Sequence, residues 1–100
     1  MSFQKTITED RRLSLLLVLE QTPGFSANAF LLRDAIDSIY GHSASVDVVR
    51  TDLSWLAEQA LVTTRTTGDV AMATLTTRGI DVVCGRAVVP GVKKPMPSGA

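Results

Sequence analysis

Apolar and polar positions alternate most regularly between Ser43 and Leu75, and this stretch predicts a capped helix followed directly by a two-stranded hairpin. Ser45, or Ser43, can accept a hydrogen bond from the first backbone N–H groups of the helix, and Asp47 places a negative charge where the helix dipole favours it. The apolar face consists of Val46, Val49, Leu53, Leu56, Ala57 and Ala60. The opposite face consists of Asp47, Thr51, Ser54 and Glu58, with Arg50 at its edge. We therefore expect one face to pack into a core and the other to stay open.

The residues after this helix have the pattern of a short hairpin. Residues 61–67 alternate and are rich in threonine, Gly68-Asp69 fits a tight two-residue turn with glycine first, and residues 70–75 form the returning strand. A last short helix is expected to start at a Thr76 or Thr77 cap, to contain Ile80, Val83 and Cys84, and to end near Gly85-Arg86.

Upstream, a first helix is expected to begin at Thr6 or Thr8, after a flexible lead-in of residues 1–7, and to end near Gln21. Its apolar residues fall in two stripes, one of Leu13, Leu16 and Leu17 and the other of Leu15, Val18 and Leu19. Because such a helix must be covered on both sides, two alternatives remain open. Either the C-terminal segment covers the second stripe, or Leu15 and Leu19 form a dimer interface.

A second helix is expected to begin at a Ser26 cap, with Phe25 and Phe30 forming a hydrophobic staple, and to end at Gly41. Its buried face should consist of Leu31, Leu32, Ala35, Ile36 and Ile39.

The element order, which is two helices, a capped helix, a hairpin and a short helix, predicts an α+β, mainly α fold, a winged helix-turn-helix. The domain should span residues 8–86. Residues 87–100 should form an extended or disordered basic tail rich in Pro and Gly, with Val88, Val89 and Val92 able to lie along the body.

Composition supports one domain of 100 residues with 45% hydrophobic content. The net charge is zero, although a DNA-binding domain usually carries a basic excess. The single cysteine excludes an internal disulfide and suits a reducing cytoplasm, so we expect a cytoplasmic location. The apolar run before Leu19 is too short to cross a membrane, and Glu9 and Asp10 do not suit a secretory signal.

Several short motifs resemble the small winged-helix regulators of the ArsR and MarR kind. They are Leu53-x-x-Leu56 followed by Ala60-Leu61-Val62, and Leu75-Thr76 with Gly79 opening the last helix. The sequence VVPGVKKP in the tail additionally resembles small winged-helix proteins of Mu-like phages and prophages, which are usually described as transcriptional regulators. The resemblance implies double-stranded DNA as partner. It does not imply metal sensing, because the reading helix lacks the cysteine pair of the metal sensors, and the turn before the wing has Ala60 where glycine is usual.

The open face of the capped helix is the candidate nucleic-acid contact surface, because Arg can bond guanine and Ser or Thr can contact bases or phosphates. The predicted contacts are Ser45, Asp47, Arg50, Thr51, Ser54, Arg65, Thr67, Lys93 and Lys94. The alternative is a solvated face with a local ion pair between Asp47 and Arg50. Val48 and Trp55, on the flank of this helix, either pack against the second helix or the wing base, or form a partner-binding patch.

The sequence predicts neither a metal site nor an enzyme. His42 is expected to be a hydrogen-bonded or exposed loop residue, and Cys84 a small core residue. No nucleophile lies near a base and no phosphate-binding glycine loop occurs, so we expect no cofactor, no small-molecule effector and no membrane contact. Two functions remain: a DNA-binding phage or bacterial regulator, and a winged helix that binds protein, for instance a phage assembly or regulatory adaptor.

Overall fold

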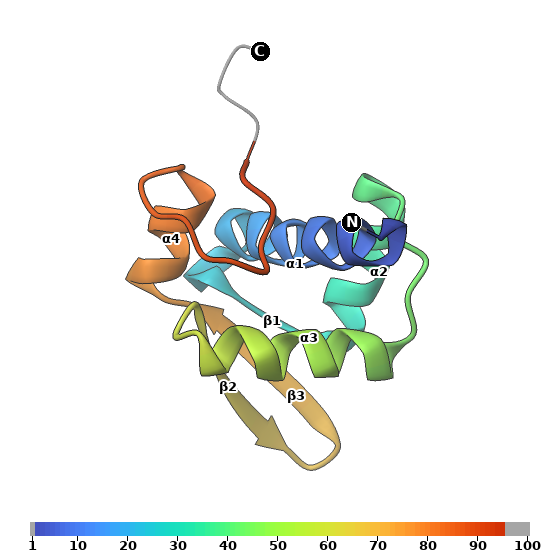
Figure 1. Ribbon diagram of the computed structural model, residues 1–100. Coiled ribbons are helices and arrows are strands. Elements are labelled where there is room, and N and C mark those ends of the chain that lie inside the picture. Colours follow the sequence, from blue (N-terminus) through green and yellow to red (C-terminus); the bar gives the residue numbers. More distant parts are fainter. Residues whose placement is uncertain (1, 96–100) are drawn as a thin grey trace.

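The computed structural model describes residues 2–95, which form four α-helices and a three-stranded antiparallel sheet. The elements are α1 (Phe3–Gln21), a 3₁₀ turn (Pro23–Phe25), β1 (Ser26–Asn28), α2 (Ala29–Tyr40), α3 (Val46–Glu58), β2 (Val62–Thr67), β3 (Val70–Leu75) and α4 (Thr77–Val83). In Figure 1, α1 lies between α2 and α4, α3 runs below it, and the β2–β3 hairpin extends away from the helices. The predicted α+β, mainly helical class is confirmed, and the expected helices and hairpin occur in the expected order, with the additional strand β1 between α1 and α2.

The core surrounds α1, which packs against α2, α4 and β3. Leu15, Leu16 and Leu19 are all fully buried within this single chain. The prediction that Leu15 and Leu19 could form a dimer surface is therefore wrong. A helix that is apolar on both sides is covered here within the same chain, by α2, α4 and β3.

The first helix begins at Phe3, so the predicted flexible lead-in is wrong for residues 3–7. Ser2 is the actual cap, since its hydroxyl accepts a hydrogen bond from the backbone N–H of Lys5 at 3.1 Å. Thr8, which looked like a cap, lies inside the helix and donates its hydroxyl to the carbonyl of Gln4 at 3.0 Å. A threonine can make this bond to the preceding turn, which makes its capping signal ambiguous.

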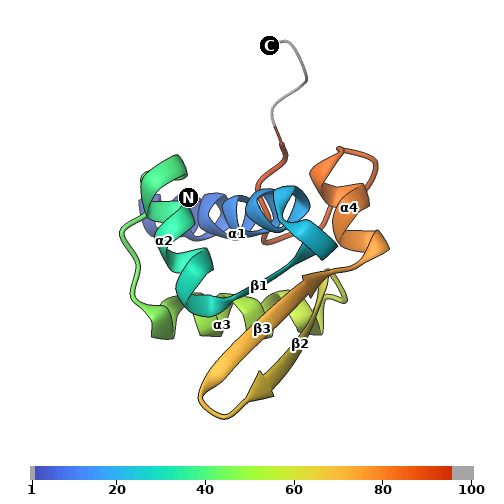
Figure 2. The same cartoon turned by 180° about the vertical axis from the view of Figure 1, so that it is seen from behind.

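The second helix begins two residues later than expected, at Ala29 with Asn28 in place of Ser26 as its cap. Ser26 is occupied elsewhere: it starts β1, which pairs with β3 at the edge of the sheet (Figure 2). The predicted Ser26 cap, and the staple that depended on it, are therefore wrong. Two residues expected on the buried face of this helix are exposed, Leu31 at 51% and Ile39 at 64%.

The stretch from α3 to α4 follows the prediction closely. Ser45 caps α3, Gly68 and Asp69 make the turn between Thr67 and Val70, and Thr76 caps α4. The predicted core position of Cys84 is wrong, because this side chain is exposed just beyond the end of α4.

Residues 87–95 cross over α1, and we call this segment the C-terminal strap (Figure 1). Val89 and Val92 are buried at 4% and 7% exposure, whereas Val88 is exposed at 62%. The described part of the predicted tail is therefore docked and contains a turn at residues 90–92, and residues 96–100 lie outside the described residues. Among residues 2–95 no helix is long and apolar enough to span a bilayer.

Ala60 ends α3 in a left-handed conformation, with φ of 61°. The backbone N–H of Ala60 bonds the carbonyl of Ala57, and that of Leu61 bonds the carbonyl of Leu56, a pattern that normally has glycine at this position. Because a Cβ atom in this conformation is strained, Ala60→Gly should stabilise the fold by about 0.5–1 kcal/mol after the entropy cost of glycine. Urea unfolding followed by circular dichroism measures this change.

The matched control is Gly41→Ala at the end of α2, where φ is 73° and no neighbouring atom would touch the added Cβ. It should destabilise the fold by a similar amount. A neutral or destabilising Ala60→Gly would contradict the strain argument.

Candidate nucleic-acid interface

The outer face of α3 is open to solvent as predicted. Its cap is formed by the Ser45 hydroxyl, which accepts a bond from the backbone N–H of Val48 at 3.2 Å. The exposed residues of this helix and its cap are Ser45, Asp47, Val48, Thr51, Ser54 and Glu58. Small hydroxyl side chains therefore dominate the part of α3 that could enter a groove, and its carboxylates lie at both ends.

Arg50 connects α3 to the tip of the hairpin. Its Nη2 donates to the carbonyl of Asp69 at 2.8 Å, and its Nη1 lies 3.9 Å from a carboxylate oxygen of Asp47. A groove of about 440 Å³ lies between α3 and the hairpin, lined by Arg50, Leu53, Ser54, Thr64, Thr66, Gly68, Asp69 and Ala71. Arg50 therefore holds the hairpin tip against the helix as well as facing solvent.

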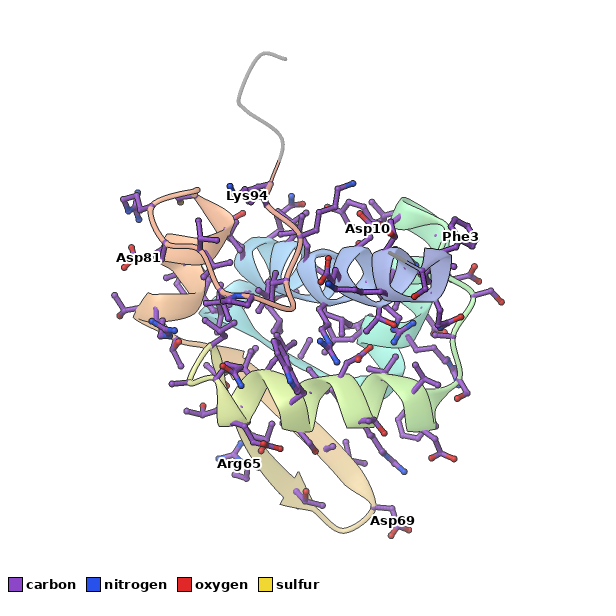
Figure 3. All side chains as sticks on the ribbon, viewed as in Figure 1. Phe3, Asp10, Arg65, Asp69, Asp81 and Lys94 are labelled. Atoms are coloured by element: carbon purple, nitrogen blue, oxygen red, sulfur yellow. The ribbon has the colours of Figure 1, made fainter. Side chains whose placement is uncertain are left out.

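The hairpin residues divide between two faces. Thr64 and Thr66 line the groove towards α3, whereas Arg65 borders a separate hollow with Met72 and Thr74. Arg65 and Thr67 alternate with the groove-facing threonines, so they lie on the side of the sheet away from α3. Figure 3 shows Arg65 at the side of the hairpin and Asp69 at its tip. The sequence pattern predicts that Arg65 and Thr67 belong to the same contact surface as α3. The alternation of side chains along the strand instead puts them on the opposite face of the hairpin.

The two lysines of the strap are not brought to this surface. The backbone N–H of Lys93 bonds the carbonyl of Glu9, and its ammonium group lies 3.2 Å from a carboxylate oxygen of Asp10 on α1. Lys94 lies at the opposite end of the molecule from Asp69 (Figure 3). The structure therefore does not support the prediction that these lysines and α3 contact the same short segment of duplex DNA.

Trp55 is partly buried and packs against Arg12 of α1 and Gly91 of the strap. The guanidinium carbon of Arg12 lies 3.9 Å from the centroid of the indole, and Arg12 Nη1 donates to the carbonyl of Gly91 at 3.2 Å. Gly91 lies so close that a Cβ atom there would be 2.6 Å from the indole ring. The predicted partner surface of Val48 and Trp55 is therefore incomplete, because only Val48 remains exposed, at 37%.

Asp52 is a functional position that the sequence reasoning missed. Its side chain is 3% exposed and accepts hydrogen bonds from both Arg11 and Arg12 of α1. A buried carboxylate is stable only when it is paired and hydrogen-bonded, and here two guanidinium groups supply both the opposite charge and the hydrogen bonds. The signal was available, since Asp52 directly precedes Leu53 on the packed side of α3 while two adjacent arginines follow the acidic pair in α1. This ion cluster fixes the inner side of α3 to α1.

A second polar cluster joins α1, the turn before α3, and the strap. Asp10 accepts bonds from His42 Nε2 at 2.6 Å and from the Lys93 ammonium at 3.2 Å, which confirms a hydrogen-bonded loop histidine. Burial opposes the charge of Asp10, but these bonds and the adjacent positive charges hold the pKa of its carboxyl below the ordinary value. Among residues 2–95 no three His, Cys, Asp or Glu side chains gather as metal ligands would.

The arrangement of a helix-turn-helix, α2 and α3, followed by a two-stranded hairpin defines a winged-helix fold. Solved structures agree. RosR of H. salinarum matches with a TM-score of 0.64 at 19% identity over 73% of this chain and 64% of that chain. A structure titled as a complex of RosR with S4 matches with a TM-score of 0.64 at 18% identity, over 79% of this chain and 70% of that chain. The chain thus spans less than two thirds of the first RosR structure.

The chain belongs to the same family as the uncharacterized protein gp26 of Escherichia phage Mu, with 50% identity over 91 residues, covering 91% of this chain and 93% of gp26. An uncharacterized protein of Haemophilus influenzae is 51% identical over 63 residues, which are 63% of this chain and 60% of that protein. The resemblance to Mu-like phage proteins is confirmed. No family model matches the sequence, so the resemblance to the ArsR and MarR kind remains one of motifs and element order.

Gly91→Ala should displace the strap from Trp55. The added Cβ meets the indole, and φ of 100° is unfavourable for alanine, so the free energy of unfolding should fall by about 2 kcal/mol. The emission of Trp55, the single tryptophan, should shift to longer wavelength as the ring becomes wetter. Gly85→Ala is the control, because its φ is 81° but the nearest atom to the added Cβ lies at 4.0 Å. Equal emission shifts in the two variants would contradict the contact.

The Asp10 cluster should make stability depend on pH. Because folding lowers the pKa of Asp10, its ionised form stabilises the fold above the unfolded value of about 3.8, and this contribution is lost as the pH falls through the folded pKa. Asp10→Asn should therefore lower the urea midpoint at neutral pH, and its difference from the wild type should shrink in acid. Asp37→Asn, at an exposed carboxylate of α2, is the control. A difference that stays constant down to about pH 3 would exclude this role.

Proposed function

We propose that this chain is a winged-helix DNA-binding protein that acts as a transcriptional regulator in the bacterial cytoplasm. The observation that carries the proposal is the open outer face of α3, a capped helix whose inner side is fixed to α1 and whose Thr51 and Ser54 side chains are exposed. In helix-turn-helix proteins the second helix enters the major groove and the first crosses the backbone. The fold shared with RosR and the kinship with a phage protein support this proposal.

In this proposal α3 reads base edges and the hairpin lies beside the backbone. Ser45 and Ser54 can donate to or accept from bases and phosphates, and Asp47 can accept from the amino group of cytosine. The Thr51 hydroxyl donates to the carbonyl of Asp47 at 2.9 Å, so it meets a base as an acceptor. Arg65 contributes a phosphate contact only if the duplex curves around the hairpin to its outer face. No catalytic role is proposed. A homodimer, if one forms, has to use side chains other than the buried Leu15 and Leu19.

The second candidate is a protein-binding winged helix, and one observation favours it. Phe30, Leu31 and Val48 are 40%, 51% and 37% exposed on α2 and α3, while Asp47 and Glu58 bring negative charge to the same helix pair. Exposed apolar side chains suit a protein partner, whereas carboxylates repel phosphate. DNA remains the favoured partner because the exposed Ser45, Thr51 and Ser54 side chains of α3 are small and polar, as a helix in a DNA groove requires.

Binding to labelled duplexes from a random-sequence selection, titrated at several salt concentrations, tests the proposal. The cationic side chains available near this surface are few, so about two or three phosphate contacts should give a slope of log K against log salt near −2 to −3. Ser54→Glu places a carboxylate in the α3 groove and should weaken binding at least about tenfold by repelling phosphate and blocking base contact.

The charge-matched control is Gln4→Glu, an exposed position beside the strap on α1. It should bind almost as well as the wild type. Equal losses in Ser54→Glu and Gln4→Glu would move the contact away from α3, and no binding by the wild type at about 50 mM salt would leave protein binding as the function.

A further inference from the structure

Phe30 and two arginines form a small cluster at the surface of α2 and α3. The guanidinium carbons of Arg33 and Arg50 each lie 5.6 Å from the centroid of the Phe30 ring. The ring is 40% exposed, and both arginine side chains are 37% exposed. Neither Phe30 nor Arg33 belongs to the contacts that the sequence predicts. Burial in the core does not explain why an aromatic ring lies at the surface beside two cationic side chains.

The cluster lies where three elements meet. Phe30 and Arg33 come from the beginning of α2, Arg50 comes from α3, and Arg50 also bonds the hairpin tip through the carbonyl of Asp69. The first turns of α2 lie close to α3 in both ribbon views (Figures 1 and 2). When the second helix of such a pair lies in a major groove, the first crosses the bordering sugar-phosphate backbone. The cluster therefore occupies the place where a backbone phosphate would pass.

The ring contact prepares the arginines for an anion. A guanidinium group within about 6 Å of an aromatic face is attracted to the ring, and its N–H groups that do not face the ring can bind phosphate through two parallel bonds. The ring contacts, and for Arg50 the bond to Asp69, also restrict both side chains before any ligand arrives. Less side-chain entropy is then lost on binding.

Each arginine already has a carboxylate neighbour, but these pairs are exposed and weak. Asp34 accepts from Arg33 at 3.1 Å with its own side chain 66% exposed, and Asp47 lies 3.9 Å from Arg50 with its side chain 88% exposed. Exposed ion pairs contribute little, because water screens them. A phosphate can therefore replace the carboxylates at small cost.

We propose that Phe30, Arg33 and Arg50 form an anchor for a backbone phosphate of duplex DNA, in which the Phe30 ring supports both guanidinium groups. This inference rests on the proposed DNA-binding function and adds two residues to it. The anchor positions α3 in the groove and carries no sequence preference, because every nucleotide presents the same phosphate. Arg50 then serves the backbone and the hairpin tip, and base discrimination is left to Asp47, Thr51 and Ser54.

The test compares full-length Arg33→Ala, Arg33→Lys and Phe30→Leu with the wild type, using fluorescence anisotropy on a selected duplex and on a scrambled duplex of equal length. Arg33→Ala should weaken binding to both duplexes by about three- to tenfold, and its salt slope should become shallower by about 0.9 for one lost phosphate contact. Arg33→Lys keeps the charge but loses the planar fork, so it should recover only part of the affinity. Phe30→Leu keeps apolar bulk but removes the ring, and it should weaken both duplexes less than Arg33→Ala.

Arg86→Ala is the matched control, because Arg86 is an exposed arginine just after α4 that pairs with Asp81 of that helix. In Figure 1, α4 and α2 lie at opposite ends of α1. It removes the same charge and should leave affinity and slope close to the wild type. If the wild type binds DNA and Arg33→Ala matches Arg86→Ala in both readouts, the anchor is overturned and the DNA-binding function stands. If Arg33→Ala weakens only the selected duplex, Arg33 reads a base and the anchor is likewise overturned. If the wild type binds neither duplex, the proposed function itself fails, and the anchor with it.

Discussion

The position of α3 depends on the buried carboxylate of Asp52. It is almost inaccessible to water and is held by Arg11 and Arg12 of α1, so the inner side of the proposed reading helix is fixed by charge as well as by Val49, Leu53 and Leu56. Removing one partner of such a buried cluster typically costs about 3–5 kcal/mol, because an uncompensated charge remains. Arg12 extends the cluster outward by stacking on Trp55 and bonding Gly91 of the strap. The helix, α1 and the strap therefore form one unit.

Features that depend on residues close together in the sequence are predicted correctly, whereas features that depend on distant residues are not. The α3 cap, the Gly68 turn and the Thr76 cap depend on residues a few positions apart, and these features are confirmed. The strand β1 and the docked strap depend on partners about forty to eighty residues away, such as Thr74 for Ser26 and Arg12 for Gly91. No local pattern encodes these contacts. The start of α1 was missed for another reason: Ser2, Thr6 and Thr8 can each cap a helix, and the local sequence does not decide among them.

For the candidate site, the sequence identifies the open helix face but not how its charges are used. Every predicted residue of α3 is solvent-accessible to some degree, yet Arg50 is shared with the hairpin tip and Lys93 with Asp10. The overall balance of charge therefore overstates the cations available to a polyanion on any one side. A protein of this kind would gain affinity mainly from fit in the groove, and it would associate only weakly with unrelated DNA.

The strap has a further consequence for architecture. Ser2 and Lys94 line the same hollow, so the two ends of the described chain emerge together, on the side of α1 away from the hairpin (Figure 3). A fluorescent protein, affinity tag or second domain joined at either end would project away from the face that α3 presents. The fold therefore has two separate sides, so a group attached at one of these ends and a molecule bound at α3 would not collide.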